Sequence, residues 1–579
     1  MQPFDYTTVK AVCYSLQQEH IPSRLEQVYQ VDPYTLSLCL RSVKKKSWLT
    51  ISWHPKAARI CIGNPPPRVK DTFTLSEQLR HLINGYALIA INILTPWERV
   101  VDFQFATRPS DSPLYHLYVE IMGKYSNVIL TNSENQIITL AKQITSEKSS
   151  LRILQTSGIY QPPPPPTGDI PQLEESFEKW QAKVSLIPGK IQQQLLKTYR
   201  GVSPSLSRYL LQKAHINPDK INQDLTIDEW KNLYLQWHSW LFRLENNLFS
   251  PSFTPEGYTV IADDETESLS YVHQVINQYY SQLLKRENFI NLKQQLQNKI
   301  NNLLKKLYQK KEGYLAKIQE SENCEIYKNQ ADLLMANIHL WQPGMREIVL
   351  QDFLTNKPVK IPLSPDKNII QNAQNLYKQH QKLKRAKQAV QPLLQSTVAE
   401  INYLEQILTN IKQLEYEDEQ DYTILQEIKL ELINQKYLED NQSRLPLRQD
   451  NQSQPRKYYT PSGKEVLVGR NNRQNDILTF RIATDYDLWF HAQEIPGSHV
   501  LLRLNPGEIP EEEDLQFVAN LAAYYSQGRE SEQVPVVYTH PSCVYKPKGA
   551  KPGMVVYRKE KVIWGNPLAV NLGDKHYNH

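Results

Sequence analysis

The sequence predicts a multidomain α+β protein. It should contain a mixed N-terminal α/β domain, a small helical helix-hairpin domain, a long antiparallel coiled-coil hairpin with a small tip insert, and a C-terminal α/β domain. Three observations predict this architecture. The length of 579 residues suggests about four units of ordinary size. Short runs with strand character occupy both ends of the chain. Between them, residues 256–342 lack proline and repeat apolar residues at helical spacing.

Residues 1–170 form the predicted N-terminal domain. Tyr6–His20 is expected to be its first helix, and Leu75–Tyr86 has the apolar spacing of a second one. Strands are predicted between turn signals at Arg24–Tyr29, Thr35–Arg41, Ser47–Trp53, Ala58–Gly63, Ala87–Leu94, Val100–Phe105, Leu114–Ile121 and Asn127–Thr131. The five consecutive prolines Pro162–Pro166 predict a stiff spacer at the domain boundary.

Residues 171–250 are predicted to be compact and helical. Two of their helices should be interrupted at Gly201–Pro204. A glycine-containing turn between helices can present backbone amides to a phosphate. The alternative is an ordinary helical hairpin, which needs the same kind of turn.

Residues 256–445 should form the two arms of the coiled coil. The first arm carries an apolar stripe, and a second arm extends from Asn372 to Leu438 with Pro392 as a possible kink. The stripe residues are Leu292, Leu296, Ile300, Leu303 and Leu307. A small insert near residues 324–366 would lie at the tip. A helix of about 45 residues spans roughly 65 Å. The stripes could instead serve dimerisation.

A polar linker, Ser443–Pro455, leads to the C-terminal domain, residues 456–579. Its most distinctive stretch is Asp485–Arg503, in which Leu488–Phe490 and Val500–Leu502 are expected to be strands joined by a Pro-Gly turn. His491 and His499 would then lie near the ends of two adjacent strands. They could contribute to a recognition surface, or they could be hydrogen-bonded histidines of an ordinary hairpin.

A basic segment follows in the same domain. Residues 546–561 contain six basic side chains against one acidic side chain, Glu560, and are flanked by Tyr545 and Tyr557. Lysines that neutralise phosphates beside aromatic rings that stack on bases would make a nucleic-acid surface. A solvated hairpin is the alternative.

Composition narrows the class of protein. The net charge is +5 and the mean hydropathy is −0.55. The five cysteines are scattered without a CxxC motif or a Cys/His cluster, so we expect no disulfide framework, no metal site and no cofactor. This cysteine usage fits a reducing cytoplasm. Neither a signal peptide nor a membrane-spanning run is evident, which predicts a soluble intracellular protein.

Several motifs together resemble one family. DLWFHAQEIPGSHVLLR and PKGAKPGMVVY in the last domain resemble NFACT-R domains. SWHPKAARICI, TPWERVVDFQF and LYVEIMGKYSNVILTN near the N-terminus resemble NFACT-N domains, and ADLLMANI resembles the middle region. From end to end the chain resembles the RqcH/NEMF family of ribosome-associated quality-control factors, also described as fibronectin-binding-protein-A-like, in its bacterial form.

The resemblance implies a function and its partners. Members of this family bind large ribosomal subunits, through rRNA, that still carry peptidyl-tRNA. They recruit charged tRNA, which is alanyl-tRNA in bacteria, so that the stalled chain gains a C-terminal tail that marks it for degradation. The ribosome performs the peptide-bond chemistry, so the protein need not be an enzyme, and it would be cytoplasmic and ribosome-associated.

The resemblance also suggests the residues that contact RNA. The family's Asp-Arg signature for tRNA corresponds to Glu98 and Arg99 here, with the carboxylate one methylene longer, and Lys124 lies in a neighbouring motif. The candidate RNA contacts in the C-terminal domain are Arg470, His491, His499, Arg503, Lys546, Lys548 and Lys551.

The sequence leaves two other classes of protein as alternatives. The N-terminal region distantly resembles formamidopyrimidine-type DNA glycosylases, which suggests a nucleic-acid-modifying enzyme. Those enzymes use an N-terminal proline amine, whereas Gln2 precedes Pro3 here, so this chemistry is not expected. A fibronectin-binding surface adhesin would need an export signal or an anchor, and the sequence offers neither.

Overall fold

The structure is a computed structural model. It describes residues 4–67, 70–145, 147, 152–165, 167–254, 257–262, 271–353, 355–439 and 453–570. Pro3, Pro166 and most of the predicted linker, residues 443–452, lie outside the described residues. The chain divides into two compact units, Met1–Leu284 and Lys285–His579. None of the described helices has both the length and the apolar character needed to cross a bilayer.

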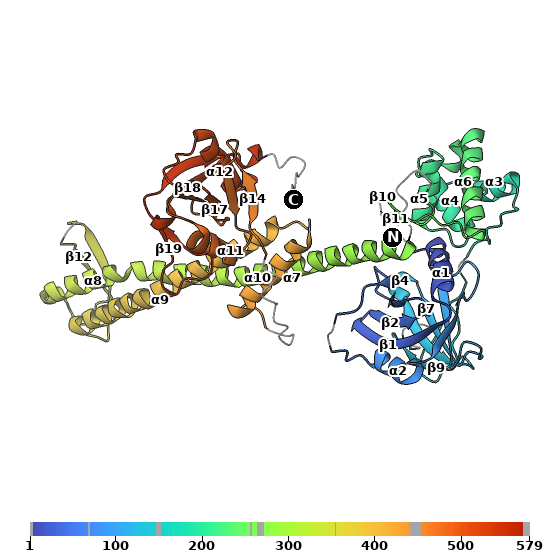
Figure 1. Cartoon of the computed structure of the whole chain (residues 1–579). Coiled ribbons are helices and arrows are strands. Elements are labelled where there is room, and N and C mark those ends of the chain that lie inside the picture. The colour runs from blue at the N-terminus through green and yellow to red at the C-terminus, as the bar shows by residue number, and fades with distance from the viewer. Residues whose placement is uncertain are drawn as a thin grey trace. The chain divides into compact units, whose positions relative to one another are not determined.

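The first unit opens with helix α1 (Tyr6–His20), which Asp5 caps by accepting a hydrogen bond from the Thr8 amide at 3.0 Å. A nine-stranded sheet follows, in the order β4-β3-β2-β1-β5-β6-β7-β8-β9, and neighbouring strands pair antiparallel (Figure 1). The strands are β1 (Ser23–Asp32), β2 (Thr35–Arg41), β3 (Lys46–Ser52), β4 (Arg59–Gly63), β5 (Ala87–Ile93), β6 (Val100–Ala106), β7 (Tyr115–Glu120), β8 (Asn127–Asn132) and β9 (Ile137–Leu140).

Sequence patterning accounts for this sheet. The alternating residues Leu36, Leu38 and Leu40 of β2 are fully buried and belong to the same core as Val12 and Leu16 of α1. Helix α2 (Thr74–Ile83) adds Leu75, Leu79 and Ile83 to that core. The predicted first helix and the eight predicted strands are confirmed, with ends that differ by up to three residues, whereas β9 was not predicted.

The helical part of the first unit contains α3 (Phe177–Ser185), α4 (Ile191–Thr198), α5 (Pro204–Lys213) and α6 (Ile227–Glu245). The predicted interruption is confirmed, because α4 ends before Gly201 and α5 begins at Pro204 with Ser203 as its N-cap. Trp240 of α6 donates a hydrogen bond to Thr7 Oγ1 of α1 at 3.0 Å. The helices and the sheet therefore share one core. The short strands β10 (Ser252–Thr254) and β11 (Gly257–Thr259) pack nearby.

Long helices dominate the second unit: α7 (Val272–Glu322), which begins in the first unit, α9 (Ile369–Gln413) and α10 (Glu419–Asn434). Lys293 of α7 donates to the Leu414 carbonyl at 2.6 Å, and Tyr308 further along α7 bonds to Glu405. Residues further along α7 therefore contact residues earlier in the sequence of α9, so the two helices are antiparallel. This confirms the predicted antiparallel hairpin. Its apolar stripe is buried inside this chain against Ile401, Leu404, Ile407, Ile411, Leu425, Ile428 and Leu432.

A small subdomain occupies the tip of the hairpin. It consists of helix α8 (Cys324–Ala336) and the two-stranded sheet of β12 (Glu347–Gln351) and β13 (Pro358–Pro362). Leu334, Ile348 and Ile361 are buried against Ala373 of α9. The insert expected near residues 324–366 therefore folds onto the start of α9. Pro392 lies further along, inside α9.

A six-stranded sheet forms the C-terminal domain, in the order β14-β15-β17-β16-β18-β21. The strands are β14 (Arg456–Tyr459), β15 (Glu465–Val468), β16 (Leu488–Ala492), β17 (Val500–Leu502), β18 (Val534–Thr539) and β21 (Lys561–Gly565). Helix α12 (Glu512–Tyr524) packs on the face that includes Phe490. Helix α11 (Asn472–Ile477) leads into a π-helical turn, Leu478–Ile482, which packs on the opposite face with Leu467 and Leu501.

Candidate nucleic-acid interface

The turn that carries Glu98 and Arg99 joins β5 to β6 and is held between helices of the first unit. Trp97 has a φ of +67°, an unusual value for a bulky residue. Its ring stacks on Tyr6 of α1 with centroids 4.7 Å apart and meets Trp240 of α6 edge-on at 5.8 Å. Gly201, at φ +73°, lies so close that a Cβ there would be 2.6 Å from the Trp97 ring. Packing therefore fixes the position of this turn.

Burial gives Glu98 and Arg99 a distinctive electrostatic setting. Glu98 is only 7% exposed, and burial raises the pKa of its carboxyl while Arg200 opposes that rise. Burial lowers the pKa of Arg99, and the neighbouring Asp5 and Tyr280 oppose this change. An arginine remains charged under such conditions. The site therefore keeps a guanidinium charge in partly desolvated surroundings, where it can bind an anionic or polar ligand strongly.

Asp5 links this charge to an adjacent pocket. Its carboxylate accepts hydrogen bonds from Ser203 Oγ at 2.6 Å and from Thr8 Oγ1 at 3.2 Å. Burial raises the pKa of Asp5, while these hydrogen bonds and Arg99 oppose the rise. Asp5 thus lines a cavity at the N-terminal end of α5 and is also close enough to Arg99 to interact with its charge.

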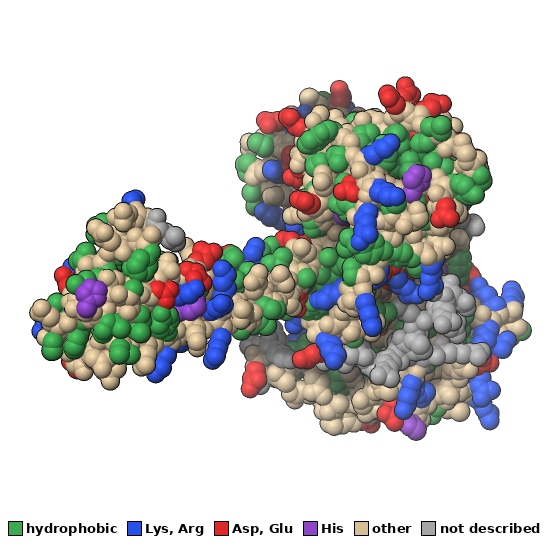
Figure 2. Space-filling model, turned by 90° about the vertical axis from the view of Figure 1, so that its left-hand side faces the viewer, with side chains coloured by type: hydrophobic (Ala, Val, Ile, Leu, Met, Phe, Trp, Pro, Cys, Tyr) green, Lys and Arg blue, Asp and Glu red, His purple; other side chains and the backbone are tan. Residues whose placement is uncertain are grey.

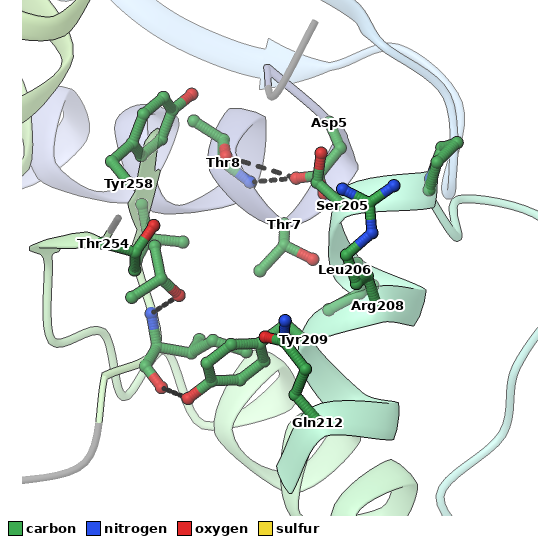
Figure 3. Close-up of a pocket in the computed structure, with 14 residues that line it drawn as sticks. Asp5, Thr7, Thr8, Ser205, Leu206, Arg208, Tyr209, Gln212, Thr254 and Tyr258 are labelled. Carbon is green, nitrogen blue, oxygen red and sulfur yellow. Dashed lines mark hydrogen bonds between the residues drawn. The ribbon is translucent and has the colours of Figure 1, made fainter. Parts of the chain in front are cut away.

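The pocket has a volume of about 490 Å³ and is lined by both polar and apolar side chains (Figure 3). Helix α1 contributes Asp5, Thr7 and Thr8, and α5 contributes Arg208, Tyr209 and Gln212 from the facing side. Thr254 and Tyr258 from the β10–β11 region complete the labelled rim. Hydroxyls, an amide and a guanidinium around one cavity suit a hydrogen-bonding ligand of nucleotide size better than an apolar one.

Lys124 lies near the same end of the sheet. It follows β7 in a short 3₁₀ turn, three residues after Ile121, whose amide donates to the Arg99 carbonyl at 2.9 Å. The Lys124 side chain is exposed, with its ammonium 4.9 Å from the centre of the Tyr125 ring. The structure therefore places Lys124 and Arg99 at the same end of neighbouring strands. The role of Lys124 in tRNA binding stays a prediction.

His491 and His499 belong to a buried cluster in the C-terminal domain. Their rings meet edge-on at 5.4 Å, and Trp489 stacks on His491 at 5.7 Å. His499 is 2% exposed and shares a 2.7 Å hydrogen bond with Thr479 Oγ1, which also accepts from Trp489 Nε1. Burial lowers the pKa of His491 to about 4 and holds the pKa of His499 well below its usual value of 6.5. Both rings are neutral near pH 7 and support the strands from within; contact with RNA stays a prediction for them.

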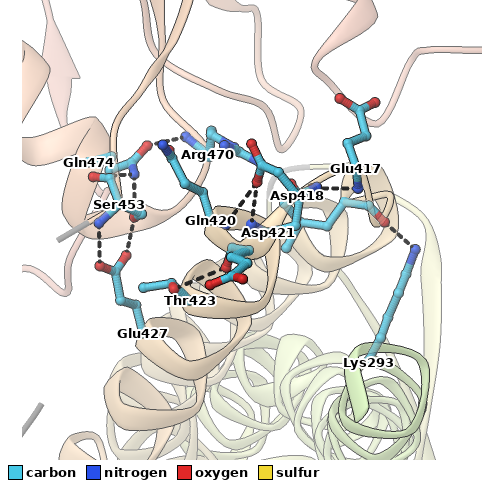
Figure 4. Close-up of polar contacts among 12 residues, drawn as sticks. Lys293, Glu417, Asp418, Gln420, Asp421, Thr423, Glu427, Ser453, Arg470 and Gln474 are labelled. Carbon is cyan, nitrogen blue, oxygen red and sulfur yellow. Dashed lines mark hydrogen bonds and ion pairs between the residues drawn. The ribbon is translucent and has the colours of Figure 1, made fainter. Parts of the chain in front are cut away.

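Four more of the candidates have partners inside the protein. Arg503 donates to the Ile482 carbonyl at 3.0 Å, and Lys546 is paired with Asp476. Lys551 bonds to the Tyr437 hydroxyl, with its ammonium 4.5 Å from the Tyr403 ring centre. Arg470 forms an ion pair with Asp421 of α10 (Figure 4). Lys548 is exposed on the hairpin formed by β19 (Val544–Tyr545) and β20 (Val556–Tyr557). These five RNA contacts also stay predictions.

Exposed aromatic and basic side chains occur on that hairpin and on β21, which follows it in the sequence. Trp564 on the edge strand β21 is 57% exposed, and Tyr545 on β19 is 40% exposed. The Arg558 guanidinium lies 5.1 Å from the Tyr545 ring centre, and Lys559 and Lys561 follow it on the surface. The face in Figure 2 carries both basic and acidic side chains in small separate groups. A local basic and aromatic patch is therefore more informative here than the net charge.

Polar contacts attach the C-terminal domain to the long helices (Figure 4). Besides the Arg470–Asp421 pair, Glu427 of α10 accepts hydrogen bonds from Ser453, and Gln474 donates to the same serine. Gln413 of α9 donates to the Ser526 carbonyl at 3.1 Å. Because these contacts are largely buried, they fix the position of the C-terminal domain against α9 and α10.

A half-buried arginine near a cavity, a basic hairpin with exposed aromatic rings, and long helices that lie between them in the sequence point to a multidomain protein that binds RNA. Comparison with protein families agrees. Residues 5–451 match the NFACT N-terminal and middle domains, and residues 455–559 match the NFACT protein RNA binding domain. The chain belongs to the NFACT family of ribosome-associated quality-control factors.

Individual relatives cover nearly the whole chain. The protein called Rqc2 homolog RqcH in Bacillus subtilis (strain 168) is 27% identical over 98% of both chains. Its namesake in Streptococcus suis (strain 05ZYH33) is 28% identical over 94% of both. Among solved structures, the C-terminal part of the fibronectin/fibrinogen-binding protein from Streptococcus suis is 31% identical, covering 48% of this chain and 95% of that one, with a TM-score of 0.37.

Sequence reasoning missed several residues of both sites. The sequence motifs do not predict Asp5, Ser203, Arg200 or Tyr258. Ser203 is a strong N-cap residue after a glycine, a signal that could have placed it beside the pocket. Trp564, exposed on an edge strand, alternates with inward residues, and this period-2 pattern was available in the sequence.

Proposed function

We propose that this protein binds large ribosomal subunits blocked by peptidyl-tRNA and recruits a charged tRNA, alanyl-tRNA, to extend the stalled chain with a C-terminal tail. The tail would mark the chain for degradation. The observation that carries the proposal is the match of both family models, which together span residues 5–451 and 455–559. The relatives named above, which are similar over nearly their full length, support the same reading.

The first unit supports the tRNA-binding part of the proposal. Arg99 offers a charge that neighbouring groups hold in place, and Asp5, which interacts with that charge, lines a cavity of about 490 Å³. A guanidinium can bind a phosphate through two parallel hydrogen bonds, while hydroxyls and amides can recognise a base or a ribose. We assign Glu98, Arg99 and the exposed Lys124 to this contact.

The C-terminal domain supports the rRNA-binding part. Lys548, Arg558, Lys559 and Lys561 are exposed, as are the rings of Tyr545 and Trp564. Basic side chains can neutralise phosphates while exposed rings stack on unpaired bases. Contacts with Asp421, Asp476 and Tyr437 make Arg470, Lys546 and Lys551 better suited to orienting this surface than to forming its outermost layer.

The protein would act by positioning RNA, and it need not be an enzyme. The ribosome would form each peptide bond, and this chain would supply binding energy and orientation for the incoming tRNA. The 51-residue helix α7 and the 45-residue helix α9 provide a long scaffold for contacts with a large partner.

The test is purification of the tagged protein from cells at low salt, followed by sequencing of the bound RNA. Large-subunit rRNA together with alanine-accepting tRNA is the expected result. Arg99→Ala should lose the tRNA while keeping the rRNA, which separates the two contacts. Recovery without rRNA even at low salt would overturn the proposal, because phosphate-driven binding is strongest there.

A further inference from the structure

Three potential metal ligands meet where the long helix α7 ends and α8 begins. α7 stops at Glu322, and Cys324 and Glu325 occupy the first turn of α8. His380 on α9 faces them, with its Nε2 3.5 Å from Glu325 Oε1. The thiol sulfur, a carboxylate oxygen and an imidazole nitrogen of these three residues all lie within 4.8 Å of one another.

Two of the three potential ligands, His380 and Cys324, are buried. His380 is 9% exposed, and its buried Nε2 makes no hydrogen bond in the part of the chain that the structure describes. Cys324 is a free thiol and is 7% exposed. Burying a polar nitrogen without a hydrogen bond costs free energy. Because the His380 nitrogen faces the other two donors, a ligand bound between the three residues would remove that cost.

Contacts between α8 and α9 fix the relative positions of the three potential ligands. Near His380 on the same helix, the Tyr377 hydroxyl bonds to Asp332 of α8, and Ala373 belongs to the same buried cluster as Leu334. These contacts keep the two helices at a fixed separation. Glu325 is exposed, so its side chain can move without disturbing the core. A small closure of the cluster therefore needs no change in the backbone.

The donor chemistry selects the ion. Thiolate and imidazole favour borderline-soft cations of the zinc class, whereas magnesium and calcium prefer sites made of oxygen. Tetrahedral zinc ligands at their usual bond lengths lie about 3.5 Å apart, within reach of donors that are now up to 4.8 Å apart.

We propose that Cys324, Glu325 and His380 bind a zinc-class divalent cation that joins the start of α8 to α9. Three protein ligands leave a fourth position for water or for a further ligand. The ion would fix the helical direction at the break between α7 and α8, and thus the tip subdomain on its arm. The simpler alternative is a histidine–carboxylate contact beside a buried cysteine that only packs.

Cobalt titration of the full-length protein, after chelator dialysis, distinguishes the two. Co²⁺ bound to a thiolate gives a near-ultraviolet charge-transfer band, and Zn²⁺ should displace it. Wild-type protein is expected to bind a single equivalent with this band. Cys324→Ser should lose the band, and His380→Gln and Glu325→Gln should bind about tenfold more weakly or worse. The matched controls Cys543→Ser and His339→Gln, both in the second unit, should bind as wild type does.

Circular dichroism establishes that each variant is folded. If Cys324→Ser does not fold, the affinities of His380→Gln and Glu325→Gln decide the matter. Wild-type protein that shows no band, or affinities that are unchanged in these two variants, would overturn the proposal. Added Zn²⁺ should also raise the melting temperature of wild-type protein and leave that of His380→Gln unchanged.

Discussion

Gln406 and Gly497 form a two-way hydrogen-bonded clamp between α9 and the C-terminal domain. The Gly497 amide donates to Gln406 Oε1 at 2.9 Å, and Gln406 Nε2 donates back to the Gly497 carbonyl. Gly497 lies in the Pro-Gly turn between β16 and β17, and a Cβ there would be 3.1 Å from Ser526. One side chain on the long helix thus satisfies both backbone groups of the turn.

Removal of this clamp should destabilise the second unit. Gln406→Ala leaves the buried Gly497 amide without this partner and the Gly497 carbonyl with the 3.3 Å contact to His491 Nε2, which should lower the free energy of unfolding by about 1–3 kcal/mol. Urea denaturation measures the loss. Gln395→Ala, at an exposed position on the same helix, is the control and should change stability by less than about 0.5 kcal/mol. Equal stabilities of the two variants would show that the clamp contributes nothing.

The buried Arg470–Asp421 pair should be strongly coupled. Arg470→Met leaves the Asp421 carboxylate buried and should cost about 3–5 kcal/mol. The double variant with Asp421→Asn should cost less than the sum of the single variants, as chemical denaturation can measure. Additive costs would argue against the pair. The exposed Lys285–Glu419 pair offers the control, because Lys285→Met should cost less than about 1 kcal/mol.

Arg99→Ala should weaken tRNA binding by about ten- to a hundredfold, because a charge-assisted contact contributes roughly 1.5–3 kcal/mol. Filter binding with purified alanyl-tRNA measures the change. Arg108→Ala, in an exposed loop of the same unit, removes an equal charge and should have little effect. If both variants bind equally well, Arg99 is not the contact.

Lys548→Glu should reduce affinity for ribosomal RNA and lower the slope of log K against log salt concentration by about one. Lys457→Glu serves as the control, because Lys457 is exposed on β14, at the opposite edge of the sheet from β21. Fluorescence anisotropy over a range of salt concentrations provides both slopes. Parallel lines for Lys548→Glu and wild type would remove Lys548 from the interface.

Acid should destabilise the C-terminal domain through its histidines. The pKa of His491 falls from 6.5 to about 4 on folding, so between these values the unfolded chain binds a proton that the folded chain does not. Stability is therefore complete above about pH 6.5 and declines as the pH falls toward 4. His491→Gln should flatten this decline in thermal unfolding. An unchanged pH profile would contradict the assignment.

The sequence predicts features of the fold that depend on neighbouring residues better than features that depend on contacts between distant residues. Leu36, Leu38 and Leu40 alternate, so β2 was predictable residue by residue. Leu296 and Ile300 repeat at helical spacing, so the arms were predictable, although only the structure shows that Ile407 of the same chain covers them. Local periodicity encodes the elements, while the choice of packing partner depends on contacts that are distant in sequence.

The candidate sites show the same division. Arg99 was identified through a motif, but its neighbour Asp5 is 94 residues away and comes close only through the packing of α1. Arg470, His499 and Lys551 were predicted to contact RNA, but each of them has a partner inside the protein. Their partners Asp421, Thr479 and Tyr437 lie on other elements, and a linear reading has no means of finding them.

The contact between Gly201 and Trp97 has a practical consequence for chimeric proteins. Any residue larger than glycine at position 201 would push the indole aside and move the turn that ends in Arg99. A designer who transplants the nine-stranded sheet into another family member must therefore bring residues 171–250 with it. Variant libraries designed to change tRNA preference should take the sheet and residues 171–250 from the same parent protein and vary other residues.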